Sequence, residues 1–399
     1  MPLLLLCGCS DENSIPAAPV AIDETGIVAS VPAQRAEAKQ REPEDERLLR
    51  VGVIGPETGP QASYGLSVVE GAAAAARRIN GGGGVSGREI ELVHYDNEGG
   101  PGLTQAIIRD LIDQRVVAIL SAPTGWSTFA PVHMANESNT IFISIGARRR
   151  IGRSGPYVFR AALPDEIATD EVVEYATERF GYVDYAMVTS STYDYSLDVS
   201  ASFKQALARH GRALKIEADT YDTYSGKSDV AKVVDTITSD STSVHGVIFT
   251  GGPIEGMQLA RALREAGANI PIFGGEDLFS SRYLEGGDSV RGTVVYATFS
   301  PDRKSDEMVE FRKQLGEHRP DRFTALAYDC FLLLAQAIEL AGTTKSSKVR
   351  EALVEIDDFE GVTGKMDFAP EGTPIKHAFL HELRKDERGS RFVLLEPAQ

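Results

Sequence analysis

The sequence predicts an α/β protein with two doubly wound, Rossmann-like lobes. First, short apolar strands alternate with helices of about 10–15 residues from residue 48 onward, which is typical of βαβ units whose parallel sheet is covered on both faces. Second, the alternation occurs in two series of similar length that meet near residue 165. Third, the 399 residues are enough for two or three domains, so each series can form its own sheet.

The first series contains four expected strands, which read LLRVGVI, EIELVHY, VVAILS and TIFISI. Their continuous runs of Val, Ile and Leu are typical of strands that are buried on both faces. Helices are expected between these strands, at about 64–79, 101–113 and 126–137.

The second series begins with the helix DEIATDEVVEYATERF at 165–180. It continues with the expected strands VDYAMVTS, ALKIEAD, VHGVIFT and IPIFGG. Helices are expected between these strands at 195–209, 228–239 and 255–266, so the second series repeats the architecture of the first.

The pattern changes after about residue 298. Helices are expected at 304–316, 323–341 and 346–355, followed by segments that look antiparallel. This tail is too short for a third domain, so we expect the two lobes to share it. The expected division puts residues 48–162 with 299–372 in lobe 1, and residues 163–298 with 373–399 in lobe 2.

The N-terminal residues 1–9, MPLLLLCGC, resemble the end of a bacterial lipoprotein signal, with a lipidation box at Leu6-Cys7-Gly8-Cys9. Cys9 is the expected lipidation site. The positively charged segment that usually begins such a signal is missing, so a start upstream and a chance apolar N-terminus both stay open. Residues 10–47 are rich in Ala, Pro, Glu and Asp and predict a disordered tether.

The remaining composition narrows the class of protein. Acidic residues outnumber Lys and Arg by 58 to 41, which disfavours a nucleic-acid surface because such a surface needs clustered cations. Cys330 lies in an apolar stretch and is expected to be a buried helix residue, and the three cysteines provide no disulfide framework. After the N-terminus we expect no membrane span, since no run approaches about 20 apolar residues.

The motifs of nucleotide-binding proteins and of enzymes fit poorly. In GGGGVSGRE (81–89), Arg88-Glu89 replaces the Lys-Ser/Thr of a phosphate loop, and the loop precedes a strand. In GWSTF, Phe129 replaces the second glycine of a nucleophile elbow. His377 and His381 are expected to be solvated and not to bind a metal. We therefore expect no catalytic residues, no metal and no cofactor.

A binding site fits better. Ligands bind at the carboxyl ends of the strands in doubly wound sheets. The loops at those ends are rich in Gly, Ser, Thr or Tyr; they are 55–64, 121–127, 144–150, 190–195, 250–254 and 275–279. In SAPTGWST (121–128), the hydroxyls can cap the following helix or bind a ligand carboxylate beside free amides, and both roles are compatible.

From about residue 48 to residue 396, the chain resembles the Leu/Ile/Val-binding family of ABC-transporter solute-binding proteins. The stretches that carry the resemblance are GPQASYG, INGGGGVSGREIELVHYDNEG, TIFISIGA, TYDYSLDVSASFKQAL and EGMQLARALREAGANIPIFGGED. The resemblance implies a type I periplasmic-binding-protein fold, in which a three-stranded hinge joins the lobes and the lobes close on a ligand. It also implies an extracytoplasmic, monomeric carrier that captures a small amino acid or related carboxylate and delivers it to a permease, with a lipid anchor as its membrane contact.

The resemblance also implies the binding residues. Tyr64 would line the cleft from lobe 1, Tyr195 would supply an aromatic ring from lobe 2, and Glu276 would pair with the ligand ammonium. The carbonyl of Ala147 would accept from the same ammonium. The ligand carboxylate would meet the segment Thr124, Gly125, Trp126, Ser127 and Thr128.

Several departures predict an unusual ligand. Arg148 stands where the family has a threonine, Gly252 and Pro253 replace an aromatic residue, and Trp126 replaces a small hydroxyl residue. Three roles stay open for Arg148: contact with a ligand anion, a cross-cleft pair with Glu276, or a solvated position in the run Arg148–Arg150. A second function also stays open, since the same fold serves lipoproteins that sense ligands or regulate cell-wall enzymes without transport.

Overall fold

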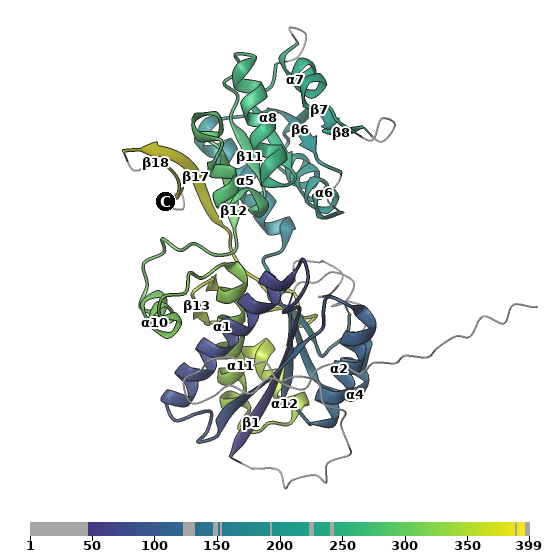
Figure 1. The fold of residues 1–399 in the computed structure, drawn as a ribbon, viewed down its shortest axis with the longest axis vertical. Helices are drawn as coiled ribbons and strands as arrows, with labels where there is room; N and C mark the ends of the chain where they lie inside the picture. Colours follow the sequence, from purple (N-terminus) through teal and green to yellow (C-terminus); the bar gives the residue numbers. More distant parts are fainter. Residues whose placement is uncertain are drawn as a thin grey trace, which may run out of the picture.

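The structure is a computed structural model that describes residues 47–122, 132–146, 151, 154–191, 194–222, 227–239, 243–387 and 389–395. It has two lobes, each built around its own sheet, and the chain passes between them more than once (Figure 1). The expected signal, lipidation site and tether lie outside the described residues.

Lobe 1 is built on a parallel sheet of five strands in the order β2-β1-β3-β4-β5. The strands are β1 (Leu48–Gly55), β2 (Glu89–Asp96), β3 (Ala118–Ser121), β4 (Ile141–Ser144) and β5 (Val158–Arg160). Helices α1 (Ala62–Gly81) and α11 (Arg322–Ala341) cover one face, while α2 (Pro101–Asp113) and α4 (Val132–Ser138) cover the other. The sequence did not predict β5, because three residues are too few for a recognisable apolar run.

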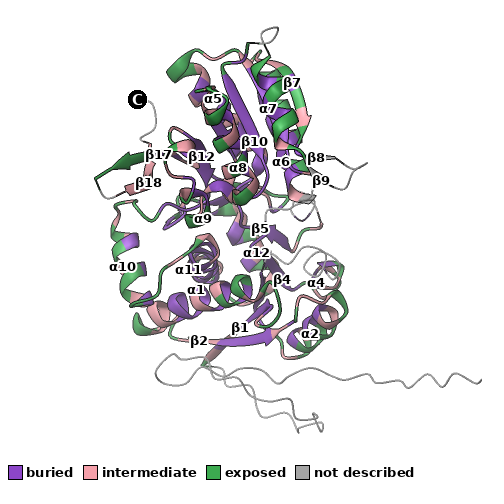
Figure 2. Cartoon of the chain, turned by 45° about the horizontal axis from the view of Figure 1, so that its top comes forward, coloured by how far each residue is buried: buried purple, intermediate pink, exposed green. Residues whose placement is uncertain are grey.

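Lobe 2 is built on a seven-stranded sheet in the order β18-β17-β12-β11-β10-β6-β7. Its parallel strands are β6 (Asp184–Thr189), β7 (Ala213–Asp219), β10 (Gly246–Thr250), β11 (Ile272–Gly274) and β12 (Val294–Ala297), and its antiparallel edge is β17 (Phe379–Asp386) with β18 (Gly389–Leu394). Helices α5 (Asp165–Phe180) and α6 (Asp194–Arg209) pack on one face, and α7 (Val230–Thr238) and α8 (Pro253–Glu265) on the other. The central strands of both sheets are buried between helices whose outer faces are exposed, whereas β7, β17 and β18 at the edges of the lobe 2 sheet are largely intermediate or exposed (Figure 2).

The smaller elements lie at the edges of these two layers. In lobe 2 they are η2 (Glu276–Leu278), α9 (Ser281–Leu284), η3 (Gly287–Val290), β8 (Tyr221–Asp222) and β9 (Lys227–Ser228). In the tail they are α10 (Asp306–Leu315), α12 (Ser346–Glu355), β13 (Glu360–Gly361), β14 (Gly364–Lys365), β15 (Asp367–Phe368) and β16 (Pro374–Ile375).

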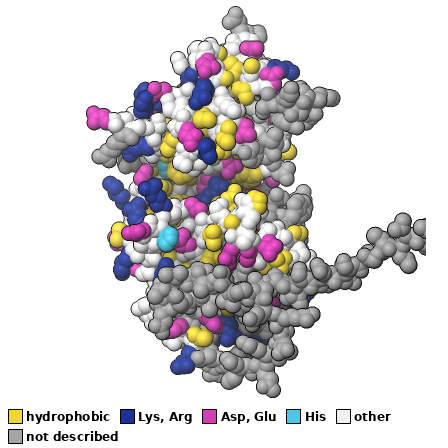
Figure 3. All heavy atoms as spheres, viewed as in Figure 1, with side chains coloured by type: hydrophobic (Ala, Val, Ile, Leu, Met, Phe, Trp, Pro, Cys, Tyr) yellow, Lys and Arg dark blue, Asp and Glu magenta, His cyan; other side chains and the backbone are white. Residues whose placement is uncertain are grey.

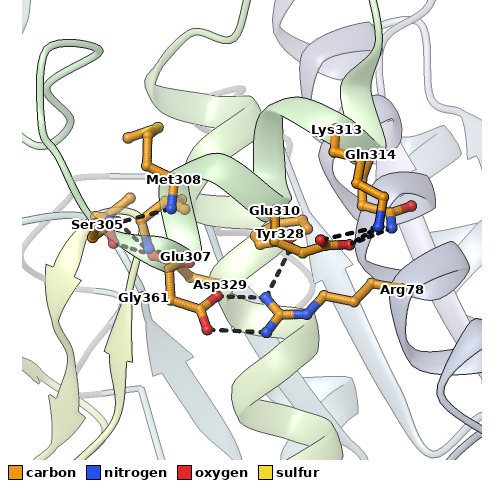
Figure 4. A network of polar contacts seen from close by, with 12 residues as sticks. Arg78, Ser305, Glu307, Met308, Glu310, Lys313, Gln314, Tyr328, Asp329 and Gly361 are labelled. Carbon is orange, nitrogen blue, oxygen red and sulfur yellow. Dashed lines mark hydrogen bonds and ion pairs between the residues drawn. The ribbon is translucent and has the colours of Figure 1, made fainter.

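The tail helices join the core of lobe 1 although they follow lobe 2 in the sequence. Arg78 of α1 pairs with Glu307 of α10 and donates to the hydroxyl of Tyr328 of α11 at 2.9 Å, so one guanidinium connects three helices (Figure 4). The helices α1 and α11 approach so closely at Gly71 that a Cβ there would lie 2.1 Å from the carbonyl oxygen of Thr324. This contact fixes the position of the N-terminus of α11.

The chain crosses between the lobes three times, after β5, after β12 and before β17. The third crossing carries Lys376, which is buried and donates to Thr363 Oγ1 at 2.6 Å. Burial lowers the pKa of Lys376 to about 8, although the nearby Asp329 opposes that change. Three crossings and two doubly wound lobes confirm the predicted fold class.

One premise and one expectation about single segments were wrong: a run of about 20 apolar residues does occur, and His381 is not solvated. Helix α11 is long and apolar enough to cross a membrane by length and composition, but 72% of its apolar stretch is buried in lobe 1. The helix is apolar because it packs against other parts of lobe 1 on most of its sides. His381 is not solvated but fully buried in β17, whereas His377 is exposed and pairs with Glu171 at 2.9 Å. Cys330 is a buried helix residue, as expected.

Candidate ligand-binding site between the lobes

A pocket of about 340 Å³ lies where the two lobes meet. Lobe 2 contributes the residues that follow β11, lobe 1 contributes the N-terminus of α11, and the second crossing lies between them. The lining residues are Glu276, Asp277, Phe279, Ser280, Phe299, Pro301, Pro320, Asp321, Arg322 and Phe323. Hydrophobic, acidic and basic side chains occur together at the level where the lobes meet (Figure 3). The pocket therefore combines apolar walls with a small number of charged groups, as ligand sites do.

Glu276 is the most enclosed acid of this pocket. It begins η2 directly after β11, and its side chain is 13% exposed. Its Oε1 accepts from the Thr298 amide at 2.6 Å, and its Oε2 accepts from Thr298 Oγ1 at 3.0 Å. The Nη1 atom of Arg322 lies 3.3 Å from the same Oε2. Thr298 is on the second crossing, so the hinge orients the carboxylate that the sequence analysis selected.

Arg322 brings a cation from lobe 1 to these acids. It is the first residue of α11, whose N-cap Asp321 accepts from the amides of Phe323 and Thr324 at 2.9 Å. Its Nη2 donates to Asp277 Oδ1 at 3.4 Å, and its guanidinium carbon lies 4.8 Å from the centre of the Phe323 ring. Burial favours a lower pKa for Arg322, but Glu276 and Asp277 raise it above its ordinary value. The guanidinium is therefore charged.

Tyr64 lies beside the pocket on lobe 1. It is in the first turn of α1 and is 37% exposed. Its ring centre lies 5.1 Å from that of Phe323, which lines the pocket. The close packing of α1 on α11 positions this pair.

Tyr195 belongs to a polar cluster in lobe 2. Its hydroxyl donates to Oδ1 of Asp165, and the hydroxyl of Tyr296 donates to the same oxygen at 3.2 Å. Burial raises the pKa of Asp165 to about 7, and the hydrogen bond from Tyr195 opposes this rise. The Tyr296 hydroxyl would lie 3.3 Å from a Cβ on Gly275, the residue before Glu276, so this cluster lies close to the pocket although Tyr195 does not line it.

The structure therefore brings Tyr64, Tyr195 and Glu276 to one region between the lobes. The other predicted binding residues, Thr124 to Thr128, Ala147 and Arg148, lie outside the described residues. The sequence indicated Asp277 only as part of the loop 275–279, and it did not indicate Arg322. Only the N-cap signature at Asp321, before the apolar run of α11, marked this helix start in the sequence, and nothing there indicated contact with Glu276.

The described residues contain no group of three or more His, Cys, Asp or Glu side chains placed to hold a metal ion. His381 instead has a packing role. Its Nε2 lies 2.9 Å from Ser300 Oγ, and its ring centre lies 4.4 Å from that of Phe279, which lines the pocket. Burial lowers the pKa of His381 to about 4, so the ring is neutral at physiological pH.

Comparisons with known proteins indicate the same kind of protein as the fold and the pocket do. The sequence profile of a family described as periplasmic binding protein matches residues 49–388. A Leu/Ile/Val-binding protein homolog of Brucella melitensis is 26% identical over 333 residues, covering 81% of this chain and 88% of the relative. The leucine-, isoleucine-, valine-, threonine- and alanine-binding protein of Pseudomonas aeruginosa is 25% identical over 345 residues, covering 85% of this chain and 90% of the relative.

Solved structures share the fold. A leucine-binding protein of Thermotoga maritima aligns with a TM-score of 0.69 at 23% identity, covering 88% of this chain and 99% of that chain. A putative branched-chain amino acid ABC transporter protein of Rhodospirillum rubrum aligns with a TM-score of 0.75 at 24% identity, covering 87% and 99%. A solute-binding protein of R. palustris, solved with 4-hydroxybenzoate, aligns with a TM-score of 0.70 at 20% identity, covering 88% and 96%.

Proposed function

This chain belongs to the periplasmic binding protein family, and from that premise we propose that it captures a small amino acid or a related carboxylate between its lobes. Family membership makes it a substrate-binding protein of the branched-chain amino acid ABC transporter type, and it supports an extracytoplasmic location and a role without catalysis. The ligand class is our inference, since the named relatives bind amino acids and a structural neighbour holds an aromatic acid.

The observation that carries the proposal is the pocket at the junction of the lobes. It is lined from both sides, and it presents the enclosed carboxylate of Glu276 beside apolar walls. A ligand bound there touches both lobes, so it favours the closed arrangement. In this proposal Tyr64, Tyr195 and Glu276 contact the ligand together with Thr124 to Thr128, Ala147 and Arg148.

Delivery and anchoring complete the proposal. The protein acts as a monomer, passes its ligand to the permease of an ABC transporter, and is held at a membrane by a lipid on Cys9. Lobe 1 comprises residues 48–162 with 299–372, and lobe 2 comprises 163–298 with 373–399. A Cys9→Ser variant that stays in the membrane fraction would contradict the anchor.

The binding function is tested by a thermal-shift screen with amino acids, small acids and aromatic acids. A ligand that binds only the native state stabilises it by about 2.7 kcal/mol at a hundredfold excess over Kd, so a true ligand raises the melting temperature. Glu276→Gln should reduce the shift, whereas Glu265→Gln, at an exposed position at the end of α8, should not. If no compound of the panel shifts the wild-type protein, the proposed ligand class is wrong.

A further inference from the structure

The guanidinium of Arg322 already pairs with Glu276, the acid that the resemblance assigns to a ligand ammonium. We propose that Arg322 determines the ligand class: its guanidinium takes the place of a ligand's cationic group at Glu276, so the site prefers hydroxy acids to amino acids. This inference rests on the proposed function and deepens it.

The groups around the Arg322 guanidinium are those that a bound cation requires. Two carboxylates face it, with Nη1 3.3 Å from Glu276 Oε2 and Nη2 3.4 Å from Asp277 Oδ1. The ring of Phe323 lies against it, with 4.8 Å between the guanidinium carbon and the ring centre. Carboxylates and an aromatic face together attract cations. The protein thus supplies its own cation from lobe 1.

The acceptor capacity of Glu276 is also nearly used. An ionised carboxylate has about four acceptor sites. The amide and hydroxyl of Thr298 take two of the sites on Glu276, and Arg322 faces a third. About one site remains, which suits the single donor of a hydroxyl better than the three donors of an ammonium.

Charge repulsion also favours a hydroxy acid over an amino acid. An ammonium at Glu276 would lie beside the Arg322 guanidinium, and like charges in a partly desolvated pocket disfavour each other. A hydroxyl donates to the carboxylate and accepts from the guanidinium, which has five N–H donors. Asp277 is 33% exposed, so water screens its charge more than that of Glu276.

Arg322 is held firmly enough to act this way. It begins α11, whose first turn is capped by Asp321, and Ser67 of α1 donates to Asp321 Oδ2 at 2.7 Å. Thr324, two residues further on, is buried against Gly71 of α1. These contacts fix the backbone of Arg322, and the ion pairs with Glu276 and Asp277 orient its guanidinium.

The test uses ligand pairs that differ in one group. Calorimetry would compare leucine with 2-hydroxy-4-methylpentanoate, and phenylalanine with 3-phenyllactate. The wild-type protein should bind the hydroxy acid of at least one pair more tightly. Arg322→Gln should shift the Kd ratio toward the amino acid by about tenfold or more, because a charged partner of Glu276 is gone. Arg322→Lys should keep the hydroxy-acid preference because it retains the cation. If the glutamine variant does not fold, the lysine variant is compared with wild type in its place.

The control is Arg319→Gln, which removes a charge at an exposed position three residues before Arg322 and outside the pocket lining. It should leave the ratio unchanged. A wild-type preference for amino acids, or a ratio that is the same in wild type and Arg322→Gln, overturns the role of Arg322 and leaves the proposed function standing. Failure of wild type to bind any amino acid or carboxylate overturns the proposed function itself.

Discussion

Burial changes the protonation of two single residues in this protein. Asp165 and His381 are both buried near the junction of the lobes, and burial moves each toward its neutral form. For an acid this means a higher pKa, and for a base a lower one. The two residues therefore couple folding to pH with opposite signs.

Asp165 should make the protein less stable as pH rises. Its pKa is about 7 in the folded protein against an ordinary value of 3.8, so between these values the native state holds a proton that the unfolded chain has released. Stability from this group is complete below about pH 4 and is lost as pH rises through about 7, by at most about 1.4 kcal/mol per pH unit.

The side chain of Asp165→Asn cannot ionise. The free energy of unfolding of this variant, measured in urea, should therefore rise relative to that of wild type as pH increases from 4 to 8. Asp198→Asn, at an exposed position of α6, should follow wild type throughout. A difference between Asp165→Asn and wild type that stays constant over this range contradicts the raised pKa.

His381 should produce the opposite trend at acid pH. Its pKa falls from 6.5 to about 4 on folding, so between these pH values the unfolded chain binds a proton that the native state does not bind. The contribution of His381 to wild-type stability should therefore be lost as pH drops from about 6.5 to about 4, while the contribution of Asp165 changes in the opposite direction. His381→Gln should lack this loss, whereas His377→Gln, at an exposed position in the same segment, should retain it. Equal acid sensitivity in all three proteins would contradict the burial of His381.

At the scale of elements, the contact between α1 and α11 positions both Tyr64 and Arg322. The pocket wall on lobe 1 begins at the first turn of α11, and this turn lies against α1 through Gly71. The N-terminal and C-terminal parts of the chain meet here, so the site depends on a packing contact between segments about 250 residues apart.

Gly71→Ala tests this contact. The added Cβ would lie 2.1 Å from the Thr324 carbonyl oxygen, which is backbone and cannot rotate away, so α1 and α11 must separate. We expect a loss of about 1–3 kcal/mol in the free energy of unfolding, as for other overpacked cores. The control is Gly102→Ala in α2, where nothing lies within 4 Å of the added Cβ. It should be neutral or stabilising by up to about 1 kcal/mol. Equal unfolding midpoints for the two variants in urea would contradict the proposed contact.

At the scale of the whole molecule, three crossings join two lobes that have separate hydrophobic cores. Such a construction permits rigid-body movement of one lobe against the other. We expect a ligand that touches both lobes to reduce the radius of gyration measured by small-angle scattering. A compound that fails to raise the melting temperature should leave the scattering profile unchanged. If a saturating ligand also leaves it unchanged, the lobes do not close on binding.

Much of the fold could be predicted because its signals are local. Apolar runs predicted the strands β1, β2, β6 and β10, and the positions of α2, α5 and α12 agree with the expected ranges. The short strands β5 and β12 were missed, because a few residues paired in a sheet carry little pattern of their own. For the site, the resemblance selected Tyr64, Tyr195 and Glu276, and their ligand contacts stay predictions.

The sequence by itself determined the alternation of strands and helices, the division into two series and the acid placed after β11. These features depend on hydrophobic periodicity and on the neighbours of each residue along the chain. Only the tertiary structure decided that Arg322 faces Glu276, that His381 is buried and that α11 is a core helix of lobe 1. Each of these depends on which distant segment packs nearby, and burial and charge pairing are properties of that assembled environment.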